Sequence, residues 1–260
     1  MKRWVVKVGS QIVCTGGPVL VRSWMQQIRT LRRDHDIEVI WVTSGAIASA
    51  VERTDFKKHK SDWLLSEKQA LSAIGQPILM DMYNISLSAV GLMGAQVLLT
   101  ASDLRDNSRR NNFKKTIEQT LKWKVVPILN ENDAISTDEI KFGDNDSLSA
   151  RVAGVISADR LVILTDVDGL YDRDPKKFKN AKIVSKLARV TNKIINDLSS
   201  KGASRLGTGG MFSKLQAAQL AANCGITTSL VKGDLPHVLV AIAEGAQFGT
   251  LIVPKKRRRT

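Results

Sequence analysis

The sequence predicts an α/β fold in which helices cover both faces of an open, largely parallel sheet. Short apolar runs rich in Val, Ile and Leu alternate along the chain with longer segments of helical periodicity. This alternation is typical of a parallel sheet, because each crossover helix packs against one of its faces. The 260 residues suffice for one large domain or two small ones. A boundary near residues 150–160 would give two lobes that share one sheet.

The first half of the chain is predicted to contribute four strands and three helices. The run from Trp4 to Val8 is apolar apart from Lys7 and ends at a glycine, which defines the first strand. Apolar periodicity defines the helices, and Gly75 and Pro77 are expected to interrupt the second of them. The predicted strands are 4–8, 38–42, 96–99 and 125–129, and the predicted helices are 20–31, 66–87 and 108–121.

The second half continues the alternation, from a helix over 146–156 into an apolar strand over 160–164. Strands over 228–231 and 250–253 then flank a helix over 235–244. No internal repeat or low-complexity linker separates these elements, so the sequence indicates one continuous α/β architecture.

Lys7 is the one cation inside the apolar first strand. Lysine is rarely buried without a partner. Its ammonium therefore either reaches solvent along its aliphatic stem or points at an anion.

Residues 207–214, Gly-Thr-Gly-Gly-Met-Phe-Ser-Lys, form a candidate phosphate-binding loop. Three glycines let the backbone approach another group closely, and a run of strong helix formers follows at 215–222. A helix that begins here would direct its N-terminal N–H groups and its positive dipole end at an anion. A flexible turn before a core helix is the alternative. The spacing is not that of a Walker A motif, so a nucleotide would be bound in another fold.

Polar side chains also gather where other predicted strands end. Thr43-Ser44-Gly45, Asn130–Asp133 and Thr165-Asp166 each follow a strand, and Gly143–Asp146 opens the next helix. Turns and helix caps explain such residues without any ligand. At the carboxyl ends of an open α/β sheet, the same groups also suit a small ligand that carries an ammonium and a carboxylate.

Composition narrows the function classes. Hydrophobic residues at 43% and charged residues at 25% are ordinary for a globular protein. No apolar run approaches the roughly 20 residues that span a bilayer, and the N-terminus is unlike a secretory signal. We therefore expect a cytoplasmic protein with no membrane partner. Cys14 and Cys224 lack metal-ligand spacing and the three histidines lie in no motif, which argues against a zinc site or a histidine-based triad.

The net charge of +14 permits binding to polyanions. The basic patches, however, lack the interleaved aromatic residues of a stacking platform for nucleic acid. Nucleic acid is therefore not the expected partner.

Together these motifs resemble the amino-acid kinase family and, within it, the glutamate 5-kinase branch. The resemblance covers nearly the whole chain, and the order of the motifs makes it specific. They are Val6-Lys7-Val8-Gly9-Ser10, Val42–Ala48, Asn130–Ala134, Gly143–Asp146, Leu164–Asp166, Gly169–Tyr171 and Gly207–Lys214. The pair of acidic and amide motifs favours this branch over relatives that act on acetylglutamate, aspartate or uridylate.

The resemblance implies a three-layer αβα sandwich and ATP-dependent phosphorylation of the γ-carboxylate of L-glutamate, the first step of proline biosynthesis. The N-terminal lobe, about residues 1–155, would bind glutamate, and the C-terminal lobe, about residues 156–260, would bind ATP. Lys7, Asp146 and Lys214 would be catalytic, and Ser44, Asp133 and Asn145 would contact glutamate. The implied nucleotide-binding residues are Lys7, Thr165, Asp166, Thr208, Gly209, Gly210, Met211, Phe212, Ser213 and Lys214.

The chemistry of this reaction suits a set of motifs without histidine. A carboxylate with an ordinary pKa of about 4.3 is already ionised at pH 7 and needs no general base. Two anions must instead be aligned and their charge stabilised by lysines, backbone N–H groups and Mg²⁺. We expect Mg²⁺ to be bound mainly through the ATP phosphates, with no metal site of the protein's own.

Three departures from the family pattern stand out. Gln11 occupies a position where a small hydroxyl residue is common, and residues 109–115 follow the usual helix start only loosely. Many relatives carry a C-terminal PUA domain, which we do not expect in a sequence that ends at Thr260.

The resemblance also leads us to expect a homo-oligomer, either dimer or tetramer, and functional coupling to glutamyl-phosphate reductase.

Two other functions stay open. One is a kinase for another small acid, of the acetylglutamate or carbamate type. The other is a polyanion- or RNA-binding protein on a retired kinase scaffold.

Overall fold

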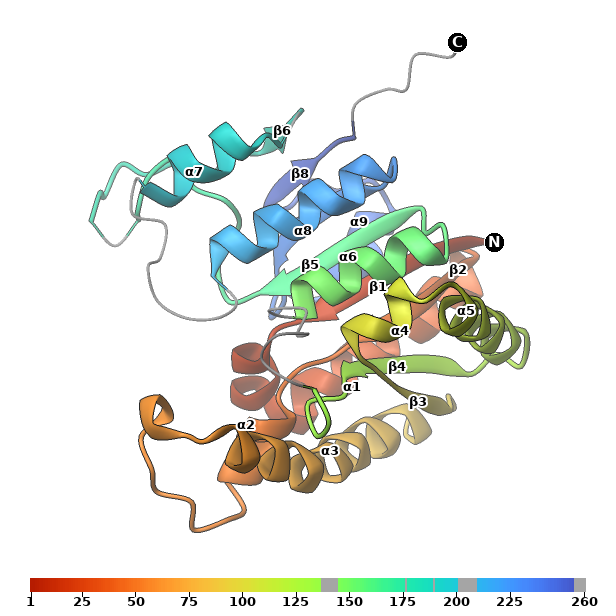
Figure 1. The fold of residues 1–260 in the computed structure, drawn as a ribbon. Coiled ribbons are helices and arrows are strands. Elements are labelled where there is room, and N and C mark those ends of the chain that lie inside the picture. The colour runs from red at the N-terminus through yellow and green to blue at the C-terminus, as the bar shows by residue number, and fades with distance from the viewer. Residues whose placement is uncertain (137–144, 176, 189, 201–209, 255–260) are drawn as a thin grey trace.

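The computed structural model describes residues 1–136, 145–175, 177–188, 190–200 and 210–254. Its core is one eight-stranded sheet with the order β3-β4-β2-β1-β5-β7-β8-β6 (Figure 1). The strands are β1 (Lys2–Val8), β2 (Ile37–Val42), β3 (Gly94–Leu99), β4 (Val126–Glu131), β5 (Arg160–Thr165), β6 (Lys186–Leu187), β7 (Thr227–Lys232) and β8 (Thr250–Ile252). Among the described strand pairs, only β7 and β8 run antiparallel. The predicted α/β class with a mainly parallel sheet is confirmed.

Helices cover both faces of this sheet and give it three layers (Figure 1). They are α1 (Ser10–Asp34), α2 (Ala46–Val51), the 3₁₀ turn η1 (Lys60–Asp62), α3 (Leu65–Ser88), α4 (Ala101–Arg105), α5 (Asn107–Lys122), α6 (Asn145–Val155), α7 (Asn192–Ser200), α8 (Met211–Asn223) and α9 (Val238–Ala243). One hydrophobic cluster joins α1, α3 and α9 to the sheet, and a second joins α5, α6 and α8 to its other face. The αβα sandwich therefore follows from two separate cores.

The central strand β1 shows how the sequence builds two cores at once. Trp4, Val6 and Val8 belong to the cluster with α1, whereas Val5 belongs to the cluster with α6. Successive side chains of a strand point to opposite faces, so an apolar run without alternation is buried on both sides. Because β1, β2, β4 and β5 are parallel neighbours, their carboxyl ends meet at one edge of the sheet.

The structure differs from the prediction in α3, which runs unbroken through Gly75 and Pro77. Gly75 packs against the first turn of α2, where a Cβ atom would stand 1.7 Å from the carbonyl oxygen of Ala46. Glycine therefore allows two helices to approach closely here, and the buried face of α3 outweighs its local cost of about 1 kcal/mol. The expected interruption at these two residues was wrong.

The first helix also begins earlier than predicted, at Ser10 rather than near Leu20. Its backbone is non-helical at Gly17, with φ 54° and ψ −158°, and Pro18 follows directly. The Gly-Gly-Pro sequence obscured the first turns, because these residues usually end a helix. Gln11 lies exposed in the first turn.

Candidate functional site

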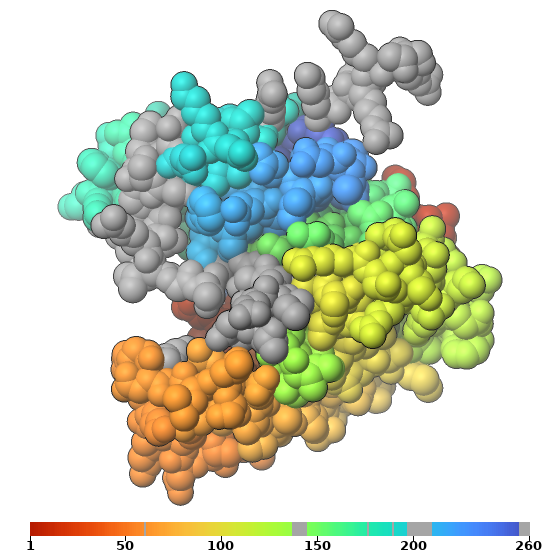
Figure 2. All heavy atoms as spheres, viewed as in Figure 1, coloured from red at the N-terminus to blue at the C-terminus, as the bar shows by residue number. Residues whose placement is uncertain are grey.

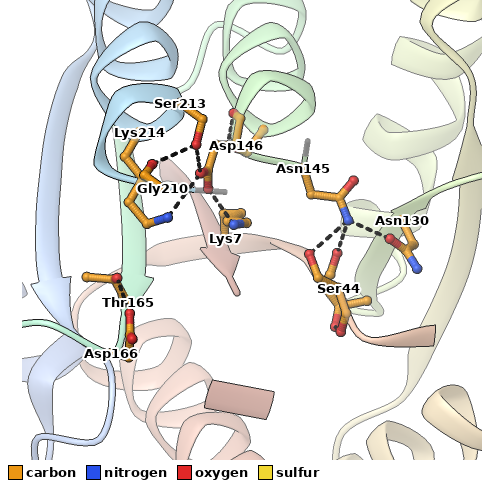
Figure 3. Close-up of polar contacts among 12 residues, drawn as sticks. Lys7, Ser44, Asn130, Asn145, Asp146, Thr165, Asp166, Gly210, Ser213 and Lys214 are labelled. Atoms are coloured by element: carbon orange, nitrogen blue, oxygen red, sulfur yellow. Dashed lines mark hydrogen bonds and ion pairs between the residues drawn. The ribbon is translucent and has the colours of Figure 1, made fainter. Parts of the chain in front are cut away.

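The centre of the candidate site is Asp146, a fully buried carboxylate in the first turn of α6. Lys7 from the last part of β1 forms an ion pair with its Oδ1 atom. Lys214 from α8 lies on the other side, with its Nζ atom 3.3 Å from Oδ2. Lys7 is 4% exposed and Lys214 is 8% exposed, so both cations are removed from bulk water. Figure 3 shows both side chains directed at Asp146. The structure thus decides between the two alternatives for Lys7, whose ammonium points at an anion.

The two lysines control the ionisation of Asp146. Burial alone would raise the pKa of this carboxyl group, but the charges of Lys7 and Lys214 outweigh burial and hold the pKa below its usual value. Asp146 is therefore ionised at neutral pH and lies between two cationic side chains. Two ammonium groups directed at one point are donors of the kind that bind phosphate oxygens.

The described end of the glycine-rich motif reaches the same carboxylate. Ser213 Oγ lies 3.0 Å from Asp146 Oδ2 and 2.8 Å from the carbonyl oxygen of Gly210. Gly210 is the N-cap of α8, and glycine has no side chain that could cap this helix end. Met211 and Phe212 form the first turn of α8, whereas Thr208 and Gly209 lie outside the described residues. A helix N-terminus beside two buried lysines suits a phosphate group.

A second polar cluster is built around Asn145, the residue directly before Asp146. Its Nδ2 atom donates to the carbonyl oxygen of Thr43 at 2.7 Å, to Ser44 Oγ at 2.9 Å and to Asn130 Oδ1 at 2.7 Å. The side chains of Asn145 and Asp146 extend to opposite sides (Figure 3). The start of α6 therefore joins a cationic cluster to an amide and hydroxyl cluster.

Tyr83 of α3 forms hydrogen bonds to Trp41 of β2 and to Thr43, which follows β2. Its hydroxyl lies 2.8 Å from Thr43 Oγ1 and accepts a hydrogen bond from Trp41 Nε1 at 3.0 Å. Complete burial raises the pKa of Tyr83 to about 12, against the opposing effect of these two hydrogen bonds. The neutral phenol fixes Thr43, whose carbonyl oxygen in turn holds Asn145.

The remaining predicted residues lie at strand ends. Thr165 Oγ1, at the end of β5, donates to Asp166 Oδ1 at 3.0 Å, and Figure 3 places this pair below Lys214. Asp133 lies in the turn that follows β4. Figure 2 shows α2 and α3 on one side of this face of the molecule and α7 and α8 on the other.

Comparison with known proteins places this geometry in a family. The sequence pattern described as "Amino acid kinase family" matches residues 2–232. The chain belongs to the amino acid kinase family. It is 41% identical to a protein named "Glutamate 5-kinase" from Thermoanaerobacter sp. (strain X514), over 98% of this chain and 68% of that relative. It is 38% identical to one of the same name from Hahella chejuensis, over 99% of this chain and 67% of the relative.

Solved structures agree with this family at the level of the fold. The UMP kinase from Bacillus anthracis has a TM-score of 0.65 at 19% identity, over 97% of this chain and 96% of that one. The aspartate kinase from Synechocystis also has a TM-score of 0.65, at 18% identity, over 98% of this chain and 40% of that one.

The site of this amino acid kinase fits the phosphate groups of ATP. Two buried lysines and the N-terminus of α8 supply donors of the kind that a triphosphate needs. Among the described residues, no group of three His, Cys, Asp or Glu side chains could hold a metal ion. None of the helices in the described part is long and apolar enough to cross a membrane.

Sequence reasoning missed two buried amides beside the site. Asn130 was part of a recognised motif but was not singled out, and Gln76 was read only as part of an interrupted helix. Asn130 Nδ2 donates to Gln76 Oε1 at 2.7 Å. Asn130 directly follows the predicted strand over 125–129, and this position at a strand end was the available signal. Gln76 carries no signal until the fold places Asn130 against it.

Proposed function

We propose that this chain catalyses the ATP-dependent phosphorylation of the γ-carboxylate of L-glutamate, the first step of proline biosynthesis. The observation that carries the proposal is the start of α6, where consecutive residues serve two clusters. Asp146 organises two buried lysines suited to phosphate, and Asn145 belongs to an amide and hydroxyl cluster suited to a small amino acid. The relatives named "Glutamate 5-kinase" support the same assignment.

In this mechanism a γ-carboxylate oxygen of glutamate forms a bond to the terminal phosphorus of ATP as the bond to ADP breaks. The carboxylate is ionised at neutral pH, so no side chain has to remove a proton. Lys7 and Lys214 stabilise the negative charge that is shared between the carboxylate, the transferred group and the leaving group. Asp146 holds both ammonium groups in place, and Mg²⁺ would be bound through the ATP phosphates.

The remaining contacts are divided between two lobes in this proposal. Ser44, Asp133 and Asn145, from the lobe of residues 1–155, bind glutamate. The lobe of residues 156–260 binds ATP through the end of β5 and the glycine-rich motif. The proposed nucleotide-binding residues there are Thr165, Asp166, Thr208, Gly209, Gly210, Met211, Phe212, Ser213 and Lys214.

The test is a coupled assay of ADP release from purified protein with ATP and Mg²⁺. L-glutamate should support rapid release, and hydroxylamine should trap the acyl phosphate as a hydroxamate. Aspartate, N-acetylglutamate, carbamate and UMP serve as competing substrates. Equal or faster turnover of N-acetylglutamate would assign the chain to a kinase for another small acid. No turnover of any acid would favour the retired scaffold, although a scaffold has no need of Lys7, Asp146 and Lys214 together.

The product, an acyl phosphate, hydrolyses readily, so the proposal includes functional coupling to glutamyl-phosphate reductase. It also includes a cytoplasmic setting.

The proposal further includes self-association, which the surface of α3 and of the edge strand β3 supports. The whole chain has a net charge of +14, yet its segment from residue 69 to residue 102 contains a single charged residue, Asp81. Several apolar side chains there are nevertheless exposed: Ile74 at 47%, Ile85 at 71%, Met93 at 67% and Leu98 at 37%.

A second copy of this chain is the partner that this surface fits. Two strongly basic chains repel one another wherever their charged surfaces meet, and this stretch avoids that repulsion. The open edge of β3 can pair with the same edge of a second copy about a two-fold axis. Ile85→Asp and Leu98→Asp should therefore lower the mass measured by light scattering. Val19→Asp, at an apolar side chain that is 83% exposed elsewhere, is the matched control. An unchanged mass in both variants would remove this surface from the proposal.

A further inference from the structure

Three amides, of which Asn130 and Gln76 are buried, form a chain that leads from the candidate site into α3. Asn145 Nδ2 donates to Asn130 Oδ1 at 2.7 Å, and Asn130 Nδ2 donates to Gln76 Oε1 at 2.7 Å. Asn130 is 2% exposed and Gln76 is 7% exposed, so solvent does not compete for these contacts. The middle amide, Asn130, thus accepts from Asn145 and donates to Gln76.

Backbone groups fix the direction of this chain. The atom of Asn145 nearest Thr43 faces a backbone carbonyl oxygen, which only accepts, so that atom must be the nitrogen. Asn130 Oδ1 also accepts the backbone N–H of Glu131 at 2.9 Å, which fixes the second amide in the same sense. Gln76 must then present its oxygen to Asn130.

Asn145 Oδ1 and Gln76 Nε2 are the two ends of the chain. Both atoms are buried and neither has a hydrogen-bond partner within the described structure. A buried polar atom without a partner is unfavourable, so such an atom at a binding site is a place for a ligand group. Because Asn145 Oδ1 can only accept, it suits a donor such as the ammonium of an α-amino acid.

We propose that Gln76 is a positioning residue for substrate binding, acting through Asn130 to hold the amide of Asn145 with its oxygen available to the substrate ammonium. The inference rests on the proposed function, because it takes glutamate as the ligand. It adds a residue on α3 that does not touch the reacting atoms but determines how well the ammonium is recognised. Gln76 acts through its Oε1 atom, the acceptor for Asn130.

The test compares Gln76→Met with wild type on L-glutamate and on glutarate, which lacks the ammonium group. Methionine keeps the length of the side chain but removes the oxygen acceptor. We expect the KM for glutamate to rise about three- to tenfold, as for one lost hydrogen bond, with kcat and the KM for ATP changed less than about twofold. The preference for glutamate over glutarate in kcat/KM should fall by the same factor, because glutarate does not use the contact.

Two further variants make the result specific. Gln76→Glu keeps an oxygen acceptor and should retain most of the preference for glutamate. Gln69→Met is the matched control, since Gln69 lies two turns earlier on α3 and donates to the Ser136 carbonyl oxygen rather than to the amide chain. It should leave the preference unchanged.

An unchanged preference in Gln76→Met, or a preference lost equally in Gln76→Glu, would overturn the inference. Wild-type turnover separates the two proposals. If wild type does not phosphorylate glutamate, both fall, whereas normal turnover with an unchanged preference in the variant removes only the role of Gln76.

Discussion

Replacing Asp146 by asparagine is the most direct perturbation of the site. The substitution keeps the size of the side chain but removes the negative charge between Lys7 and Lys214. Both ammonium groups are almost fully buried, so water cannot replace the lost carboxylate. We therefore expect Asp146→Asn to destabilise the protein without ligand and to lower kcat, since the lysines lose their orientation.

The size of the effect follows from the burial. Removing one partner of a buried ion pair typically costs about 3–5 kcal/mol, and here one carboxylate serves two cations. In a chain of this size that corresponds to a fall in Tm of roughly 6–15 °C. Bound phosphates supply negative charge to the same lysines, so saturating ADP with Mg²⁺ should raise the Tm of the variant by at least as much as that of wild type.

The pH dependence of this stability has a definite sign. The folded-state pKa of Asp146 lies below the unfolded value of about 3.9, so the carboxylate stabilises the fold above that pH. Its contribution is lost as pH falls through the lower, folded-state pKa. The difference in Tm between wild type and Asp146→Asn should therefore stay constant from about pH 6 to pH 8 and shrink only below about pH 4.

Thermal unfolding with and without nucleotide, together with the ADP-release assay, measures all of these quantities. Asp34→Asn is the control, because Asp34 forms an exposed ion pair with Arg33 and its loss should leave Tm unchanged. If Asp146→Asn unfolds within about 2 °C of wild type and keeps kcat within a few-fold, the carboxylate does not organise the two lysines.

Three further results are expected. Lys7→Ala and Lys214→Ala should each lower kcat about 10²–10³-fold with a smaller change in the KM for ATP, and a raised KM with normal kcat would assign that lysine to ATP anchoring alone. Asp133→Ala and Asn145→Ala should raise the KM for glutamate roughly tenfold to a hundredfold in steady-state assays, whereas an unchanged KM would leave these residues as turn formers. In urea unfolding, wild type should lose stability as pH rises from about 10 to about 12, because the folded-state pKa of Tyr83 is raised to about 12. Tyr83→Phe should not show this loss. An identical alkaline profile in both proteins would contradict the prediction.

The sequence predicted most strands and the long helices because their apolar patterns depend on burial in this sheet. The runs of β1 and β5 are apolar on both faces, and such runs occur where helices cover a parallel sheet on both sides. Local signals failed where tertiary packing outweighed them. Gly75 and Pro77 lie inside α3 because that helix is held by its buried face and by its close contact with α2.

The candidate site could be predicted only in part, because its members are far apart in sequence. The family resemblance proposed Lys7, Asn145, Asp146 and Lys214 individually, but their contacts depend on the strand order. Sequence reasoning had no means of finding Gln76, since a glutamine on a helix carries no signal until Asn130 of a neighbouring strand lies against it.

Lys7 shows how a violation of a local rule can indicate a site. A cation in a buried strand is unfavourable by itself, so its presence required a partner of opposite charge somewhere in the fold. The structure supplies Asp146, whose carboxylate also pairs with a second buried lysine. This carboxylate holds the two ammonium groups close together beside the N-terminus of α8. Donors gathered in this way suit a phosphate-containing ligand, so the cation that the strand pattern left unexplained indicates where the site lies.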